Sequence, residues 1–219
     1  MTSRRLALAV LVAAVALGPA AATAEWFVDA YAGAAFTQKA TFTQETSLGT
    51  TSSPDVSFDT APSFGIRGGR WFESLPWLGV ELDLSHFEPH RKEQEVGPGR
   101  FIRERDFKVS SLAIDLRLRW PLLTSATYPA GQLQPYLALG PAVFVTQTRL
   151  PEAQTSDDLA ASPGAHAAAG MLWNFHPRVG VFAEYRFTYF HLGFKSGGVV
   201  PSDTNVSTHH LLGGVSFRF

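Results

Sequence analysis

The segment from Leu78 to Ser85 alternates strictly between apolar and polar residues. Its two sets of alternate positions are Leu78, Val80, Leu82 and Leu84 on the one hand, and Gly79, Glu81, Asp83 and Ser85 on the other. A two-residue period is that of a β-strand, whose successive side chains point to opposite faces. Burying Glu81 and Asp83 in an apolar core would be costly, so their face needs water or cationic partners. The segment therefore predicts a strand with one apolar face and one charged face.

The same kind of pattern recurs along the chain and predicts eight strands. We expect them at residues 26–37, 63–72, 78–85, 111–120, 136–146, 165–175, 179–189 and 205–219. The fifth is apolar on both faces, so the sequence does not assign its inside and outside. Gly140 and Pro141 within it predict a bulge. After residue 24, no stretch is long and apolar enough for a membrane helix.

The connections between the expected strands alternate in length. Long polar loops follow the first, third, fifth and seventh strands, and shorter links follow the second, fourth and sixth. The link of residues 121–133 is the exception, because it is long for its place. This alternation predicts an all-β fold, an eight-stranded antiparallel up-and-down barrel with its elaborate loops at one end.

Aromatic residues gather at the ends of the expected strands. All five tryptophans fall on the short-turn side, together with Phe72, Tyr136 and Phe219: Trp26, Trp71, Trp77, Trp120 and Trp173. A second girdle is expected near the long loops, from Phe36, Phe58, Phe87, Phe107 and Tyr189. Indole rings collect at membrane interfaces because the ring favours the apolar side while its N–H favours water. This sorting predicts that the apolar strand faces meet lipid.

Charged residues gather on the opposite strand faces, with five acids against five bases: Asp29, Glu81, Asp83, Asp115 and Glu184, and Arg67, Arg117, Arg119, Arg186 and Arg218. An unpaired charge would be costly in a narrow, partly dry barrel, so the near balance of sign favours an interior ion-pair network. Eight strands leave an interior only just wide enough for side chains. We expect a plugged lumen whose network comprises Arg67, Glu81, Asp83, Asp115, Arg117, Arg119, Glu184 and Arg186.

Three segments resemble a known family. VGVFAEYRFTYF (179–190), GVELDLSHF (79–87) and GVSFRF (214–219) are similar to the eight-stranded outer-membrane barrels that include the transmembrane domain of outer membrane protein A and the opacity-type surface proteins. The resemblance implies localisation in the cell outer membrane, contact with its lipids and lipopolysaccharide, and no peptidoglycan-binding domain. It also implies that Phe217 and Phe219 form a signal for the outer-membrane assembly machinery.

The amino terminus has the order of a secretory signal peptide. Arg4 and Arg5 precede twelve apolar residues, Leu6 to Leu17, and the small residues 22–24 follow. Twelve residues are fewer than the roughly 20 that an anchoring helix needs. We therefore expect a signal peptide at residues 1–24 and a barrel domain at residues 25–219.

Composition excludes several classes of partner and site. The formal net charge is −1 and no cysteine is present, so nucleic-acid binding, disulfides and thiolate metal sites are not expected. No cofactor or metal is predicted, and the expected protein is a monomer without enzymatic activity. Ser85 with His86, and His209 with His210, point to opposite faces as strand neighbours. His191 with Thr188 or Ser196 is the nearest approach to a catalytic group.

One loop could form a binding site. Residues 89–105 interleave basic side chains with Glu93, Glu95 and Glu104: Arg91, Lys92, Arg100, Arg103 and Arg105. These bases could contact lipopolysaccharide phosphates, or they could form a solvated loop with internal pairs.

The function predicted from the sequence is a structural, membrane-integrity or surface-interaction role. Three alternatives stay open. The first is a small gated pore for ions or small solutes, and the second is an outer-membrane enzyme that modifies lipid A. The third is a soluble periplasmic barrel of the lipocalin type, with its apolar face turned inward around a ligand.

Overall fold

Eight long strands form the body of the protein. The computed structural model describes residues 25–46, 49–97, 100–102, 105–148, 158–194 and 202–219. The eight strands are β1 (Trp26–Thr37), β4 (Ala61–Trp71), β5 (Leu78–Phe87), β9 (Arg105–Arg119), β10 (Leu133–Thr148), β11 (Asp158–His176), β12 (Val179–Phe194) and β13 (Ser202–Arg218). Among the described residues, no helix is long and apolar enough to cross a membrane.

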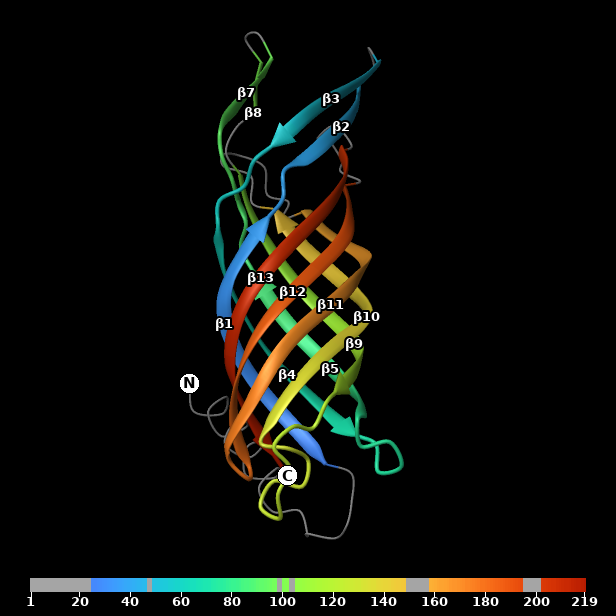
Figure 1. Cartoon of the computed structure of the whole chain (residues 1–219). Coiled ribbons are helices and arrows are strands. Elements are labelled where there is room, and N and C mark those ends of the chain that lie inside the picture. The colour runs from blue at the N-terminus through green and yellow to red at the C-terminus, as the bar shows by residue number, and fades with distance from the viewer. Residues whose placement is uncertain (1–24, 47–48, 98–99, 103–104, 149–157, 195–201) are drawn as a thin grey trace, which may run out of the picture.

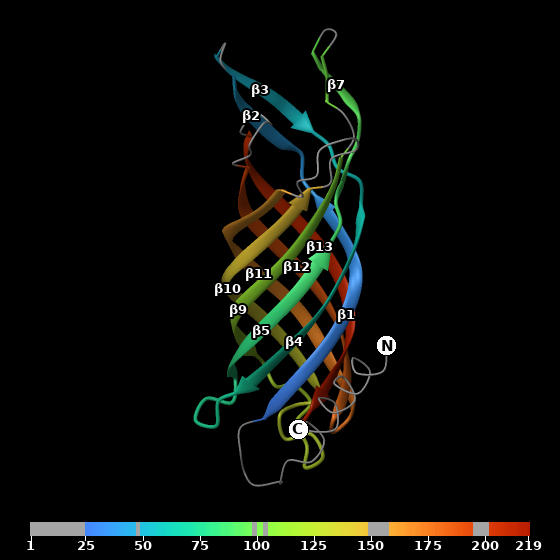
Figure 2. The same cartoon turned by 180° about the vertical axis from the view of Figure 1, so that it is seen from behind.

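The eight strands close into a barrel (Figures 1 and 2). Each is antiparallel to its neighbours in the order β1-β4-β5-β9-β10-β11-β12-β13, and β13 returns to pair with β1 from Phe27↔Arg218 to Thr37↔Thr208. Closure leaves no exposed sheet edge in the wall, which is what a β-structure needs in lipid. The predicted eight-stranded up-and-down barrel is confirmed.

The barrel turns its apolar residues outward. Leu82 and Leu84 are each 47% exposed, whereas Glu81 and Arg117 are 2% and 3% exposed. A lipocalin-type barrel requires the reverse arrangement. The predicted facing is therefore confirmed, and the soluble alternative is wrong.

The structure assigns the two faces of β10. Tyr136, Ala138, Ala142 and Phe144 are buried inside, and Leu137, Leu139, Pro141 and Val143 are exposed. The ladder with β9 is interrupted at Gly140 and Pro141, but it resumes in the same register, with Leu139 opposite Leu116 and Ala142 opposite Ala113. The predicted bulge is therefore wrong. Proline lacks the N–H for a ladder bond, which accounts for an interruption without an inserted residue.

The long-loop end contains strands where the sequence predicted loops. They are β2 (Ala40–Thr46), β3 (Gly49–Val56), β6 (His90–Arg91), β7 (Gln94–Gly97) and β8 (Arg100–Ile102). The β2–β3 hairpin adds to the upper end of β13 through Thr43 and Gln44 (Figure 1). Its many threonines favour extended backbone. A polar Thr-rich stretch can therefore form a hairpin that looks like a loop by composition.

The aromatic rim at the short-turn end is mostly as predicted. Trp26, Trp77, Trp120, Trp173 and Phe219 are all exposed on the outer surface. Trp71, by contrast, is 3% exposed and lies inside beneath the guanidinium of Arg119, 4.0 Å from its ring centroid. Tyr136 is also inside. Of the second expected girdle, Phe36 and Tyr189 face outward, whereas Phe87 and Phe107 are buried in the lumen and Phe58 packs against them.

Candidate functional site

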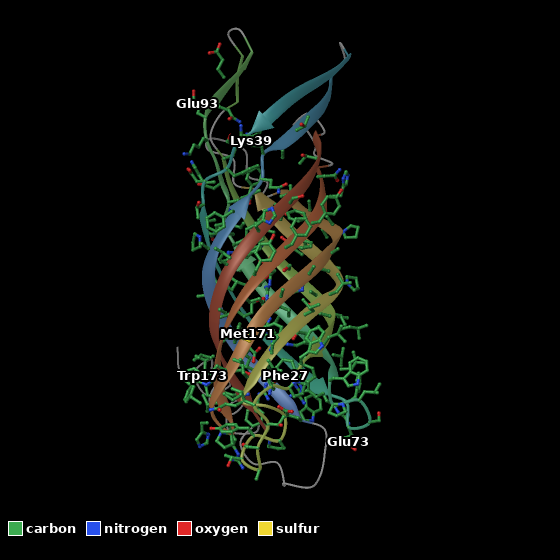
Figure 3. All side chains as sticks on the ribbon, in the orientation of Figure 1. Phe27, Lys39, Glu73, Glu93, Met171 and Trp173 are labelled. Atoms are coloured by element: carbon green, nitrogen blue, oxygen red, sulfur yellow. The ribbon has the colours of Figure 1, made fainter. Side chains whose placement is uncertain are left out.

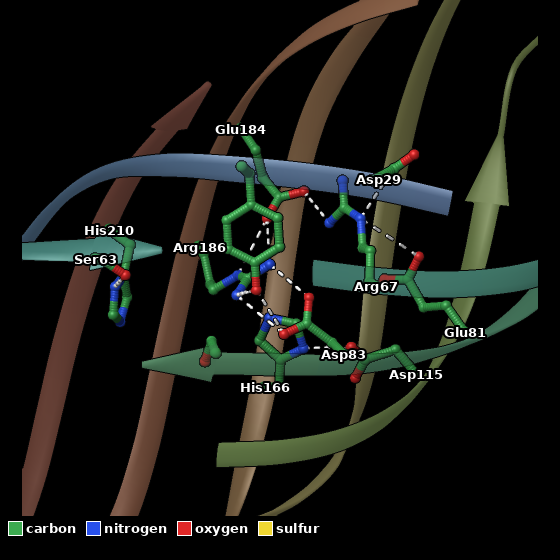
Figure 4. Close-up of polar contacts among 12 residues, drawn as sticks. Asp29, Ser63, Arg67, Glu81, Asp83, Asp115, His166, Glu184, Arg186 and His210 are labelled. Atoms are coloured by element: carbon green, nitrogen blue, oxygen red, sulfur yellow. Dashed lines mark hydrogen bonds and ion pairs between the residues drawn. The ribbon is translucent and has the colours of Figure 1, made fainter. Parts of the chain in front are cut away.

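Charged side chains fill part of the barrel interior, and Figure 4 shows many of their contacts. All eight residues of the predicted network are buried: Arg67, Glu81, Asp83, Asp115, Arg117, Arg119, Glu184 and Arg186. They come from β4, β5, β9 and β12, at the alternate positions whose side chains point to the barrel axis. Asp29 on β1 and Arg218 on β13 join them.

Arg67 is the centre of this arrangement. Its Nε donates to Asp29 Oδ2 at 2.8 Å, and its Nη1 donates to Glu184 Oε2 at 2.5 Å. Glu81 lies 3.9 Å away, and Nη2 donates to the hydroxyl of Tyr136 at 3.3 Å. One fully buried guanidinium thereby connects carboxylates from three strands, which suits its five fixed donors.

A second group of arginines occupies the short-turn end of the lumen. Arg117 donates to Glu81 at 2.7 Å and stacks 3.8 Å above the ring of Tyr136. Glu25 bridges Arg119 at 2.7 Å and Arg218 at 2.6 Å. These contacts close the lumen at this end with paired charge.

Arg186 extends the network toward the long-loop end. It lies 2.9 Å from both Asp83 and Glu184, and it donates to the hydroxyl of Tyr31 at 2.7 Å. That hydroxyl in turn donates to Asp83 at 2.7 Å. Apart from Asp115, which contacts His166, each charge of the network thus has at least one opposite partner within direct contact, as burial requires.

Two buried histidines, His166 and His210, continue the polar interior. Neither was predicted to face the lumen. His166 pairs with Asp115, and Gly140 makes room for them, because an added Cβ would lie 2.5 Å from Asp115 Oδ1. His210 shares hydrogen bonds with Ser63 at 3.1 Å and Thr188 at 3.2 Å. His210 follows the alternation of Leu212, Gly214 and Ser216 along β13. This two-residue period could have predicted that His210 faces the lumen.

An apolar plug fills the lumen toward the long-loop end. It is built by buried residues of seven strands: Ala35, Ala61, Phe87, Phe107, Val109, Ala113, Ala142, Phe144, Phe190 and Val206. Phe144 and Phe190 stack with ring centroids 4.3 Å apart and planes within 12°. The interior therefore has two layers, one ionic and one apolar.

Two small cavities lie beside these layers. A cavity of about 20 Å³ lies beside Phe58, Phe107 and Phe190, and another of about 10 Å³ beside Trp71 and Arg117. Each has room for about one water molecule. Within the described ranges, no group of three or more His, Asp or Glu side chains could hold a metal ion.

The predicted lipopolysaccharide residues are only partly described. Arg91 lies over the ring of Phe107 at 5.8 Å, and Lys92 pairs with Asp59 at 2.7 Å. Arg103 and the side chains of Arg100 and Arg105 lie outside the described residues.

Glu88 lies just after β5, at the long-loop end. Its hydrogen bond with His86 holds the pKa of its carboxyl group below the ordinary value.

Of the candidate catalytic group, His191 and Thr188 are not brought together. His191 is exposed on the outer wall, where it bonds Asn205 at 2.9 Å, whereas Thr188 is buried in the lumen. The two side chains leave β12 on opposite faces. Ser196 lies outside the described residues.

The comparisons with known proteins agree with the fold. Residues 7–219 match a family model described as an outer membrane protein beta-barrel domain. The chain belongs to this family. It is therefore an outer-membrane β-barrel protein with transmembrane strands, as the resemblance implied. A search of curated proteins finds no match.

Two solved structures show the same architecture. Neisserial surface protein A (NspA) is 19% identical, with a TM-score of 0.55 over 89% of this chain and 97% of that one. The outer membrane protein OprG from Pseudomonas aeruginosa is 13% identical, with a TM-score of 0.57 over 90% and 96%. At these identities the likeness concerns the fold.

Proposed function

We propose that the protein is a closed outer-membrane barrel with a structural, membrane-integrity or surface-interaction role, and that it does not conduct steadily. The observation that carries this proposal is the double filling of the lumen. Ions or solutes would have to displace both the paired charges around Arg67 and the stacked rings of Phe144 and Phe190. The long-loop end, with its β2–β3 and β7–β8 hairpins, is then the part available to partners outside the cell.

The purified barrel in planar lipid bilayers is expected to give no steady single-channel conductance, because paired charges around Arg67 and the stacked rings of Phe144 and Phe190 fill the described lumen. The same recordings on Arg117→Ala and Glu81→Gln provide the comparison. Stepwise conductance in the unmodified protein that either substitution alters would contradict the proposal. It would favour the small gated pore.

The surface role includes contact with lipopolysaccharide at the long-loop end. Lys92 and Lys108 are half-exposed or more, and their ion pairs with Asp59 and Glu88 lie at the surface. Surface pairs contribute only about 0–1 kcal/mol, so these ammonium groups can exchange carboxylate for phosphate at little cost. Lys92 is one of the residues that the sequence suggested for this contact, and Arg91 precedes it in the chain.

Neutralising Arg91, Lys92, Arg100, Arg103 and Arg105 together is expected to lower the amount of lipopolysaccharide that copurifies with the barrel. Arg178→Gln is the control, because it removes one exposed cation at the opposite, short-turn end. Retention equal to that of the unmodified protein would dismiss the contact.

Two further partner assignments concern the outer wall of the barrel. Phe217 and Phe219 are exposed on the outer wall, which supports a role as the signal read by the assembly machinery. The closed wall offers no free strand edge for a second copy among its eight strands, which supports a monomer.

A further inference from the structure

The connection between β9 and β10 differs from the other short-end connections. It runs from residue 120 to 132, whereas the connections between β4 and β5 and between β11 and β12 span residues 72–77 and 177–178. It reads WPLLTSATYPAGQ and carries no charged residue. A segment of this length without charge at the edge of a membrane wall can lie in lipid without burying an ion.

The barrel wall continues into this connection without a change of register. Trp120 N donates to Pro135 O at 2.9 Å, and Leu122 forms an isolated bridge with Leu133. These pairs extend the ladder in which Arg119 lies opposite Tyr136. Because a strand alternates its faces, Leu122 lies on the same side as Trp120, which is the lipid-facing side.

The connection turns its polar contacts inward. Gln134 donates to the carbonyls of Ala130 and Gly131 at 2.7 and 2.9 Å, and Asn174 donates to Gly131 at 3.1 Å. Both Gln134 and Asn174 are buried. Gly131 has a φ of +90°, and an added Cβ would lie 2.8 Å from Leu122 O. These contacts hold the connection against the end of the barrel.

Its large apolar side chains point away from the barrel. Leu122 is 45% exposed and Leu123 is 66% exposed. Leu123 has a φ of +53°, a left-handed conformation that a bulky residue rarely adopts. Trp120, Trp173 and Phe175 are exposed at the same end of the wall. Leu122 and Leu123 thus continue the apolar outer surface of the barrel, while the carbonyls of Ala130 and Gly131 accept hydrogen bonds from its buried polar side chains.

We propose that Leu122 and Leu123 dock this connection into the inner leaflet of the outer membrane, with phospholipid as the partner. The short turns of such barrels face the periplasm, so the phospholipid leaflet is the adjacent one. Two residues beyond Trp120 correspond to roughly 5 Å along the membrane normal for a strand tilted by about 45°. The polar interface on each side of the hydrocarbon is about 5–8 Å thick, so Leu122 is still within it.

The test uses single-cysteine variants of the full chain, which has no cysteine of its own. Leu122→Cys and Leu123→Cys are labelled with nitrobenzoxadiazole and reconstituted in phosphatidylethanolamine–phosphatidylglycerol vesicles with or without brominated acyl chains. Leu116→Cys, on the lipid-facing wall, is the positive control. Glu73→Cys, in the charged neighbouring turn at the same end (Figure 3), is the control for water exposure. A heat-dependent gel shift verifies that each variant is folded.

The labels at Leu122 and Leu123 are expected to show blue-shifted emission and quenching by bromine well above those of Glu73→Cys and below those of Leu116→Cys, which lies deeper along the wall. Emission and quenching equal to those of Glu73→Cys at both positions would overturn the proposal. The same result is expected if the natural partner of the two leucines is a periplasmic protein instead of lipid. That protein is absent from the vesicles, so the leucines would stay exposed to water.

Discussion

Replacing Arg67 with methionine is expected to lower the free energy of unfolding by about 3–5 kcal/mol. The substitution keeps an unbranched side chain of similar length but removes the guanidinium that contacts Asp29 and Glu184. Both carboxylates are buried, so their charge would then lack its main partner in a medium of low polarity. Urea titration of the barrel in lipid vesicles measures the loss, and the temperature of the gel shift reports the same change.

The matched control is Arg70→Met, three residues farther along β4 on the opposite face. Arg70 is exposed, and its pair with Glu73 spans 3.9 Å, so its removal is expected to change the free energy of unfolding by about 1 kcal/mol or less. The double substitution Arg67→Met with Glu184→Gln is expected to recover part of the loss, because it also removes one stranded charge. Equal stability of Arg67→Met and Arg70→Met would refute the role of Arg67 as the centre of the network.

Phe144→Ala is expected to lower the free energy of unfolding by about 3–5 kcal/mol, the usual range for a buried phenylalanine. Phe144 is fully buried in the apolar plug and stacks on Phe190. The closed wall around it prevents lipid from filling the vacated space, so the cost of a cavity adds to the lost contacts. The same urea titration measures the effect.

Phe64→Ala is the control for this second prediction. Phe64 is a phenylalanine on the outer face of β4, and it is half-exposed to the surrounding lipid. Acyl chains can occupy the space that its ring leaves, so a smaller loss of stability is expected. If the two substitutions cost the same, the apolar plug does not have the tight packing described above.

The two-residue period predicted most of the architecture, because lipid and a filled lumen are opposite solvents on the two faces of each strand. The same period also predicts the correct facing of two aromatic residues that our interpretation placed at the membrane interface. Trp71 shares its face with Arg67 and Gly69, and Phe87 shares its face with Glu81 and Asp83. We assigned both rings to the membrane interface because they lie near the ends of their strands. The alternation had already placed them inside.

The sequence alone could not predict which charged residues pair with each other in the lumen. Alternation predicts which residues face the lumen, but the partners depend on how the strands are staggered around the barrel. Arg67 and Glu184, for example, lie on β4 and β12 and meet across the axis. His166 was missed because the expected sixth strand has small residues on both sides, so its inward face carried no contrast of polarity.

The pairing of the first and last strands has a consequence for how the protein reaches its native state. Glu25 and Arg218, which are 193 positions apart, come into contact only when β13 lies beside β1. Until then, β1 and β13 each expose an unsatisfied row of amides and carbonyls. Contacts between segments so distant along a chain form slowly, because the loop entropy is lost before any bond compensates for it. Closure of this barrel should therefore be a late, cooperative step of folding, in which the carboxy-terminal strand pairs with the amino-terminal one.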